Sequence, residues 1–404
     1  MLGSMQESQP NKGIFVEHFS KLKDHRITRH KLHPLIEIIF LAVCGSICGA
    51  ESWRDFVMFG KTKIDYLRKY FPFKNGIPSK STIALVFSKL NPKKFKECFI
   101  GWVQAIQSVM KDIISIDGKM LRHSFNNGSN QSAIHMVSAF SDSMNLVLAQ
   151  EKVGDKTNEI TAIPKLLEIL ELTGSIVTID AMGCQTKIAK QIIDQGGDYV
   201  LGLKGNQTSL HEDVKLYFEA ELSKKDSKII EMHEDVCGEH GRVETRKCFT
   251  INHVDWLPQF KKWSGLKTLV MIESTRENKA DLAKKDANIT QASNPQIDAQ
   301  VKSTKERRFY ISSLAEGAEK HARVIRSHWN IENKVHYVLD VTFNEDASRI
   351  RKDHAPENMG IVRHTVLNML RKAKEKLKDI SLKGLRKKAG WDEDTLTSIL
   401  QQHF

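Results

Sequence analysis

The sequence predicts an α/β fold in which a mixed sheet is flanked by helices, and two apolar runs carry this prediction. Residues 176–179 form a short run that closes on Asp180, and residues 113–116 form a similar run that closes on Asp117. Runs of this kind are typical of strands buried on both faces. A charged side chain at the end of a buried strand raises the free energy of the folded state unless an opposite charge or a hydrogen bond compensates it. Both aspartates are therefore candidate site residues, although ordinary capping aspartates also occur at such positions.

The charge of the chain indicates the kind of partner. The formal net charge is +12 over 404 residues, and the sequence pI is about 9.2. A basic excess spread over a folded chain favours a polyanionic partner, although a soluble basic enzyme is also compatible with it. Six cysteines in a chain this long do not form a disulfide framework, which fits a reducing cytoplasm.

The most apolar run, residues 35–48, contains Glu37 and Gly45. It is shorter than the ~20 apolar residues that a membrane span needs. We therefore expect a buried helix here and no membrane partner.

The first part of the chain has helical periodicity. Residues 1–12 are polar and are expected to form a disordered tail, and residues 13–106 are expected to form a helical N-terminal DNA-binding domain. Pro34 suits the first turn of one helix. Residues 78–82 begin another helix with a capping serine, and Asn91-Pro92 ends it. Short helices flanked by lysines indicate either a helix-turn-helix-like DNA reader or a plain helical bundle, and both interpretations stay open.

From residue 107 the pattern changes to strands and helices that follow one another in a definite order. The expected strands are 113–116, 134–140, 146–150, 175–180 and 198–204, with helices at 159–170 and from about 184 to 196. This β-β-β-α-β-α-β order is that of the RNase H-like nuclease fold. Its sheet can bring Asp117 and Asp180 together, and we expect residues 107–207 to form the first part of this core.

The remaining chain is expected to contain an insertion and the rest of the core. Residues 208–310 carry short alternating runs, which predict a β-rich insertion, and its polar segment 276–306 is expected to be a mobile loop. Residues 311–375 are expected to complete the core. Residues 376–404 form a basic C-terminal region. The lysine-rich helix that leads into it presents either a solvated face or a phosphate contact.

A site that cuts phosphodiesters with two metal ions needs a third carboxylate, preferably on a rigid element. The strongest candidate is Glu332. Helical spacing places His328, Glu332 and His336 on one face, with Trp329 and Val335 beside them. The alternative is a glutamate on a helix surface that is paired with a neighbouring lysine or arginine.

A set of short motifs extends this interpretation over most of the chain. They are Asp24-His-Arg, His33-Pro-Leu, Asn75-Gly-Ile-Pro-Ser, Ile116-Asp-Gly-Lys, Ile134-His-Met-Val-Ser-Ala-Phe, Asn158-Glu-Ile-Thr-Ala-Ile-Pro, Thr178-Ile-Asp-Ala-Met-Gly-Cys-Gln, Leu203-Lys-Gly-Asn-Gln and His328-Trp-Asn-Ile-Glu-Asn. In this combination, from about residue 15 to about residue 400, the chain resembles the H-repeat-associated family of bacterial insertion-sequence transposases.

The resemblance implies a DDE transposase whose RNase H-like core carries an insertion before its last acid. Asp117, Asp180 and Glu332 would be both the catalytic triad and the ligands of two Mg²⁺ ions, with Mn²⁺ as a substitute. The implied reaction is hydrolysis of a phosphodiester at each element end, followed by attack of the freed 3′-OH on target DNA. The implied partner is double-stranded DNA, both terminal repeats and target, bound by a homodimer in the synaptic complex. The implied location is the bacterial cytoplasm, in association with the nucleoid.

The chain departs from one signature of related transposases, Tyr-x2-Arg-x3-Glu-x6-Lys. That signature would place Tyr, Arg and Lys where this chain has Ile325, His328 and Leu339. We expect Arg326 or His328 to take over the contact with phosphate.

Further phosphate contacts are expected just beyond the ends of strands. The candidates are Lys119, Arg122, Lys204 and Asn206, each of which could equally be an ordinary surface residue. Two other functions stay open. One is a degenerate or repurposed transposase that acts as a DNA-binding protein, and the other is a stand-alone RNase H-like nuclease that cuts without strand transfer.

Overall fold

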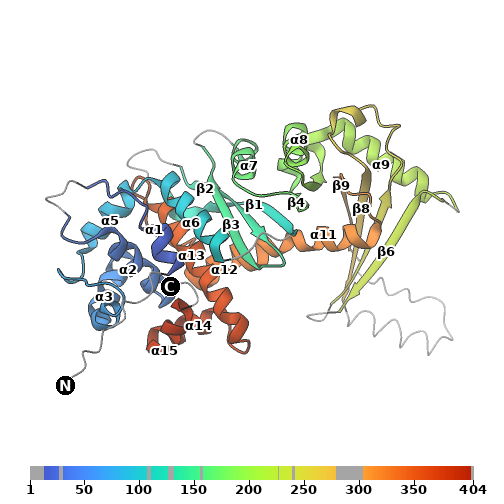
Figure 1. The fold of residues 1–404 in the computed structure, drawn as a ribbon. Helices are drawn as coiled ribbons and strands as arrows, with labels where there is room; N and C mark the ends of the chain where they lie inside the picture. Colours follow the sequence, from blue (N-terminus) through green and yellow to red (C-terminus); the bar gives the residue numbers. More distant parts are fainter. Residues whose placement is uncertain are drawn as a thin grey trace, which may run out of the picture. The chain divides into compact units, whose positions relative to one another are not determined.

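The computed structural model describes residues 13–26, 31–106, 111–125, 132–154, 158–225, 227–238, 242–278 and 304–401 (Figure 1). The chain folds as two compact units. The first, which we call the helical unit, comprises residues 1–110, 117–170 and 330–404. The second, which we call the sheet unit, comprises residues 111–116 and 171–329. The expected disordered tail at 1–12 lies outside the described residues.

None of the helices in the described ranges is long and apolar enough to cross a membrane.

The helical unit is built mainly from helices, and two of its strands, β2 Ile134–Ser141 and β3 Leu146–Lys152, form the hairpin expected from the sequence. Its helices are α1 Ile14–Phe19, α2 Leu35–Ile47, α3 Trp53–Thr62, α4 Ile64–Arg68, α5 Lys80–Lys89, α6 Pro92–Ile106, α7 Glu159–Glu168, a π-helix Ile331–His336, α12 Tyr337–Phe343, α13 Ala355–Lys376, α14 Leu382–Trp391 and α15 Glu393–Leu400.

The run at 35–48 is a buried helix, as expected. Nearly every side chain of α2 is buried in the core of the helical unit. Its acid, Glu37, is also buried and accepts a hydrogen bond from the backbone N–H of Phe73 at 3.0 Å. Burial raises the pKa of Glu37, and this hydrogen bond opposes the rise.

The expected start and end of the helix at residues 78–92 are also confirmed. The Ser79 hydroxyl accepts a hydrogen bond from the backbone N–H of Thr82 at 3.2 Å and so caps the N-terminus of α5. Helix α5 ends at Lys89, and Pro92 is the first residue of α6, where its missing N–H costs nothing.

The C-terminal helices share one core with the N-terminal helices, which the sequence did not indicate. Leu385, Leu396 and Ile399 pack in the same apolar cluster as Ile38 and Phe87. Figure 1 shows α13 and α14 beside α2 within this unit, and α15 packs against α13 and α14. The basic C-terminal region is therefore a folded part of the helical bundle.

A buried arginine ties these segments together. The guanidinium of Arg386 in α14 donates to the backbone carbonyl of Ser46 through Nε at 3.1 Å and Nη2 at 2.8 Å. It also donates to the carbonyl of Thr342 and lies 4.2 Å from the ring centroid of Phe343. These carbonyls lie in the last turns of α2 and α12, where no intrahelical N–H is available to them. One cation therefore caps two helix C-termini.

The sheet unit contains most of the strands. Its elements are the start of β1 Ile113–Leu121, then β4 Ile176–Ile179, α8 Thr186–Asp194, β5 Asp198–Leu203, α9 Thr208–Leu222, β6 Ile230–Cys237, β7 Arg242–Ile251, β8 Thr268–Asn278, β9 Thr304–Ser312 and α11 Ala318–Asn330. Strand β4 pairs in parallel with β1 and β5, and β5 pairs antiparallel with β9. The order of elements from β1 to β5 is the order predicted for the core, and the predicted mixed α/β fold is confirmed.

One face of this sheet is covered by α11. Ile113, Ile176 and Val200, from three neighbouring strands, form an apolar cluster with Val324 and Ile325 of α11. Burial of the whole of β4, including Thr178, explains why its sequence is apolar without alternation.

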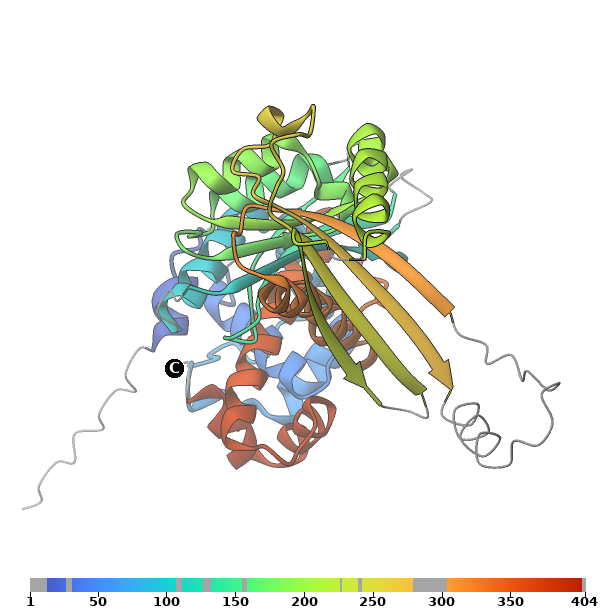
Figure 2. The same ribbon diagram turned by 90° about the vertical axis from the view of Figure 1, so that its right-hand side faces the viewer.

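The expected β-rich insertion extends the sheet. Strands β6, β7, β8 and β9 pair antiparallel in sequence order, and β9 joins them to β5 (Figure 2). Ion pairs cross these strands, with Glu273 between Lys305 at 2.9 Å and Arg307 at 2.8 Å. The two ends of the expected loop 276–306 are strand residues of β8 and β9, and the rest of that loop lies outside the described residues.

Strand β1 is longer than the sequence predicts. It was expected to end at Asp117, but it continues to Leu121. Its pairing with β4 stops at Ile116, and beyond that point the strand remains beside β2. The apolar run marks only the part of β1 that is buried on both faces.

Replacing Arg386 with methionine should lower the stability of the helical unit. The substitution keeps much of the side-chain volume but removes the side-chain donor from the Thr342 carbonyl of α12, and it leaves the Ser46 carbonyl of α2 with only the backbone N–H of Gly49 at 3.3 Å. We expect a loss of about 1–3 kcal/mol in the free energy of unfolding, seen as a lower urea midpoint by circular dichroism. Lys387→Met, at an exposed position of the same helix, is the matched control. Equal midpoints for the two variants would contradict the capping role.

Candidate active site

The two aspartates of the expected triad follow directly from the register of two parallel strands. Ile116 of β1 pairs with Ile179 of β4, and the next residue in each segment is an aspartate, Asp117 and Asp180. Because parallel strands run in the same direction, the two acids occupy equivalent positions in the sequence pattern of the two strands.

Asp180 is held by the backbone that follows it. Strand β4 ends at Ile179, and Asp180 is the N-cap of a single 3₁₀ turn. Its Oδ1 accepts hydrogen bonds from the backbone N–H groups of Met182 at 3.1 Å and Gly183 at 3.4 Å. Capping by these two backbone groups orients the carboxylate. The capping role foreseen as an alternative is therefore present at this position.

Asp117 lies within the helical unit beside three other titratable groups. Its Oδ2 is 3.4 Å from Nδ1 of His336, which is buried. Next to it, His135 of β2 and Glu159 of α7 form a pair with 2.9 Å between Nε2 and Oε1. The hydrogen bond with Glu159 raises the pKa of His135 against the opposing effect of burial. The sequence motifs contain both residues, but their pairing was not predicted.

Gly118 explains how this pair fits beside Asp117. A Cβ atom at position 118 would lie 2.0 Å from Oε1 of Glu159 and 2.7 Å from Nε2 of His135. Both distances are far below van der Waals contact, so only glycine leaves space for the pair. The glycine of the Ile-Asp-Gly-Lys motif is therefore required by packing against these two side chains.

Glu332 lies in a π-helix, which the sequence did not predict. Residues Ile331–His336 form this wider turn between α11 and α12. Glu332 is exposed, whereas His336 is buried. The expected spacing assumed a regular α-helix, which residues Ile331–His336 do not form, and the role of Glu332 as the third acid stays a prediction. Short π-helical segments are rare and frequently mark functional sites.

Side chains from two other segments of the helical unit form hydrogen bonds with the π-helix and with the residue before it. On one side, Oδ1 of Asp142 in the β2–β3 turn accepts from Nδ2 of Asn330 at 2.6 Å and from Nζ of Lys334 at 3.3 Å. On the other side, Nη2 of Arg371 in α13 donates to the carbonyl of Lys334. A donor that reaches a backbone carbonyl competes with the regular helical hydrogen bond and favours a local widening of the helix.

Three of the expected phosphate contacts, Lys119, His328 and Asn206, are engaged by other groups of the protein. Nζ of Lys119 lies 2.6 Å from Asp340, 2.9 Å from Asp346 and 3.6 Å from Glu345. Burial alone would lower the pKa of Lys119, but these carboxylates outweigh it and raise the pKa. Lys119 therefore lies within a cluster of three acids in this structure.

His328 is half-buried, and its Nδ1 lies 3.0 Å from the Thr178 hydroxyl. Burial lowers the pKa of His328 to about 4, so the ring is neutral at pH 7 and offers no charge to a phosphate.

Asn206 donates through Nδ2 to the carbonyl of Ala181 at 2.6 Å, just after Asp180. It thus holds the turn that Asp180 caps.

The other expected contacts have accessible side chains. Arg122, Lys204 and Arg326 are exposed. Nε of Arg122 lies 3.2 Å from Oδ2 of Asp346, a pairing that solvent screens because the arginine side chain is 75% exposed.

Within the described ranges, no group of three or more His, Cys, Asp or Glu side chains is placed so that it could hold a metal ion.

Comparison with known proteins shows which protein family this chain matches. Residues 109–369 match the family model described as the transposase DDE domain, and residues 16–103 match a model described as DDE_Tnp_1-associated. The H repeat-associated putative transposase YhhI of Escherichia coli K12 is 41% identical over 389 residues, which cover 95% of this chain and 97% of that protein. The putative transposase YncI of Escherichia coli O157:H7 is 39% identical over 362 residues, or 89% of this chain and 88% of that protein.

Among solved structures, a similar chain is found in the piggyBac transposase synaptic complex with hairpin DNA. The TM-score is 0.43 at 10% sequence identity, over 97% of this chain and 77% of that chain.

Replacing Gly118 with alanine should break the pair formed by His135 and Glu159. The added methyl group must displace a buried carboxylate, and we expect a loss of about 1–3 kcal/mol in the free energy of unfolding, as for other overpacked sites. The control is Gly205→Ala, because a Cβ there would have no heavy atom within 4 Å. Urea unfolding of both variants tests this prediction, which fails if the two midpoints fall together with that of the wild type.

Proposed function

This chain belongs to the transposase DDE domain family, and from that premise we propose that it cuts the DNA backbone at the ends of its element and joins them to target DNA. The observation that carries the proposal is the register of β1 and β4. It pairs Ile116 with Ile179 and so gives each strand an aspartate at the next position, Asp117 and Asp180. Glu332, exposed in the π-helix, is proposed as the third acid.

The chemistry of these three residues fits magnesium. Carboxylate oxygens are the ligands that Mg²⁺ prefers, and Mn²⁺ accepts the same donors. We propose that Asp117, Asp180 and Glu332 hold two such ions. When bound, the ions supply an activated water at neutral pH and stabilisation of the leaving 3′ oxygen.

The protein's own contribution is to fix the ligands in place. The backbone N–H groups of Met182 and Gly183 orient Asp180, and Nδ1 of His336 lies beside Asp117. Second partners of this kind hold a ligand in the geometry that the chemistry requires. The exposed cations Arg122, Lys204 and Arg326 remain proposed phosphate contacts, and a homodimer is proposed for the complex that joins two element ends.

One experiment separates this function from its alternatives. Labelled element ends are incubated with the full chain, Mg²⁺ and a target plasmid, and the products are resolved by electrophoresis. A transposase gives ends joined to the plasmid. A stand-alone nuclease gives cut ends without joining, and a repurposed DNA-binding protein gives shifted but uncut DNA. Either of the last two results would overturn the proposal.

Glu332→Gln should abolish cleavage and joining while leaving DNA binding within about twofold of the wild type. The amide keeps the shape of the side chain but removes the charge that a divalent ion needs. Glu319→Gln, at an exposed position in the first turn of α11, is the matched control and should retain full activity. Cleavage is followed with labelled ends in Mg²⁺ and again in Mn²⁺. Wild-type cleavage by Glu332→Gln would remove this residue from the triad.

A further inference from the structure

We propose that a basic groove in the helical unit binds the phosphodiester backbone of DNA beside Glu332. The groove has a volume of about 450 Å³, and its polar lining includes Asn333, Lys334, Arg371, Lys374, Glu375 and Lys378. This inference rests on the proposed function, which supplies DNA as the partner, and it assigns one surface of the helical unit to that partner.

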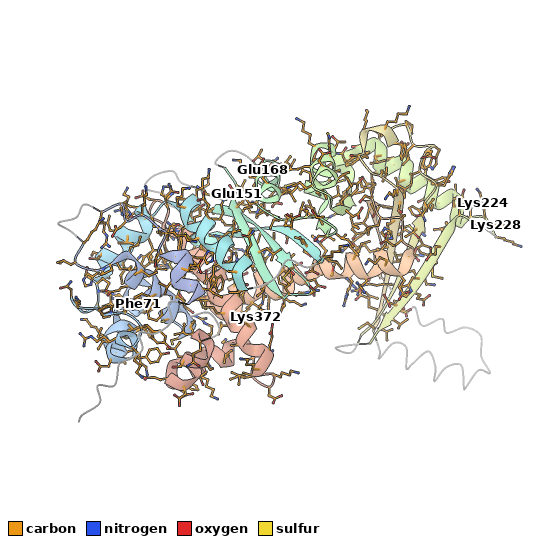
Figure 3. All side chains as sticks on the ribbon, viewed as in Figure 1. Phe71, Glu151, Glu168, Lys224, Lys228 and Lys372 are labelled. Atoms are coloured by element: carbon orange, nitrogen blue, oxygen red, sulfur yellow. The ribbon has the colours of Figure 1, made fainter. Side chains whose placement is uncertain are left out.

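The groove is formed by two rigid elements. Asn333 and Lys334 belong to the π-helix and follow Glu332 directly. Lys374 lies in the last turn of α13, and Lys378 follows the end of this helix. Lys372, labelled in Figure 3, is on the same stretch of α13. A strand of DNA held in this groove would therefore pass next to the third proposed acid.

The lining carries a clear excess of positive charge. It contains three lysines and one arginine against one carboxylate, Glu375. That carboxylate is itself neutralised from outside the lining, because Oε1 of Glu375 lies 3.1 Å from Nζ of Lys372. Among the described residues, neither Lys374 nor Lys378 has an acidic partner within ion-pair distance. The two lysines are thus available to a polyanion.

Arg371 gives the groove a feature that an ordinary lysine-rich surface lacks. Its side chain is about 95% buried, with a relative exposure of 5%. Nη2 donates to the carbonyl of Lys334, and the guanidinium lies 5.2 Å from the ring centroid of Phe140. Nη1, however, is buried and has no hydrogen-bond partner among the described residues, and no described carboxylate pairs with the guanidinium.

Burying a cation without a counter-charge destabilises the fold, and a buried N–H without an acceptor adds to that cost. Burial lowers the pKa of Arg371 to about 9, which still leaves it charged at pH 7. A phosphate oxygen in the groove would supply both the missing negative charge and the missing acceptor. Arginine suits this role because its planar group presents several N–H donors to one phosphate.

The test uses the two accessible lysines, so that the core stays intact. In the full chain, Lys374 and Lys378 are both replaced by glutamine, and the dissociation constant for a duplex element end is measured by fluorescence anisotropy between 50 and 300 mM NaCl. Losing two phosphate contacts should reduce the slope of log affinity against log salt by about 1.8, since each contact contributes about 0.9. At 100 mM NaCl, affinity should fall roughly tenfold. Lys376→Gln, on the same helix but outside the lining, is the matched control and should change neither quantity.

The outcomes separate this inference from the proposed function. If the double variant binds DNA with the affinity and salt slope of the wild type, the groove is not a DNA site, whatever the cleavage assay shows. If cleavage and joining fail in the wild type while the double variant still loses affinity, the groove stands and the catalytic proposal falls. A thermal shift with inorganic phosphate is a further arm. If phosphate stabilises the wild type but not the double variant, and DNA affinity is equal in both, the groove binds only a small anion and the inference is overturned.

Discussion

The parallel pairing of β1 with β4 is the constraint on which the candidate site depends. It places Ile113–Ile116 against Ile176–Ile179, and it stops at the same step in both segments, one residue before an aspartate. After that step the two chains diverge. Strand β1 continues to Leu121, whereas the chain after β4 turns because Asp180 caps a 3₁₀ turn. Strand β4 is buried along its whole length, so its apolar pattern does not alternate, and the position of the acids follows from the pairing of Ile116 with Ile179.

The position of the third acid has a different origin. Glu332 does not follow a strand. It lies in a helix that is locally widened where Arg371 donates to the carbonyl of Lys334 and where Asp142 accepts from Asn330 and Lys334. These partners come from α13 and from the β2–β3 turn, far away in the sequence. In this segment Glu332 is exposed, whereas His336 is buried and its Nδ1 lies 3.4 Å from Oδ2 of Asp117.

This contrast explains what could be predicted from the sequence. The order of strands and helices in the core is local information, carried by apolar runs and turn residues, and the structure confirms it. The length of β1, the π-helix and the packing of α14 against α2 depend on partners that no local pattern reveals. Lys119 and His328 illustrate the same limit at single residues. Each occurs where a phosphate contact would be expected, yet Asp340 and Thr178 engage them inside the protein.

The buried cations also change how the net charge of +12 relates to DNA binding. Arg363 pairs with Glu345 at 3.2 Å, and Nζ of Lys119 lies among three acids. The guanidinium of Arg386 donates through Nε, Nη1 and Nη2 to carbonyls at the ends of helices. These charges hold the fold together and contribute little to counterion release on binding. Arg371 is equally buried, but only its Nη2 is satisfied by the fold. The difference between Arg386 and Arg371 is therefore an unused donor, and a buried donor that the fold leaves unused is where an external acceptor gains most.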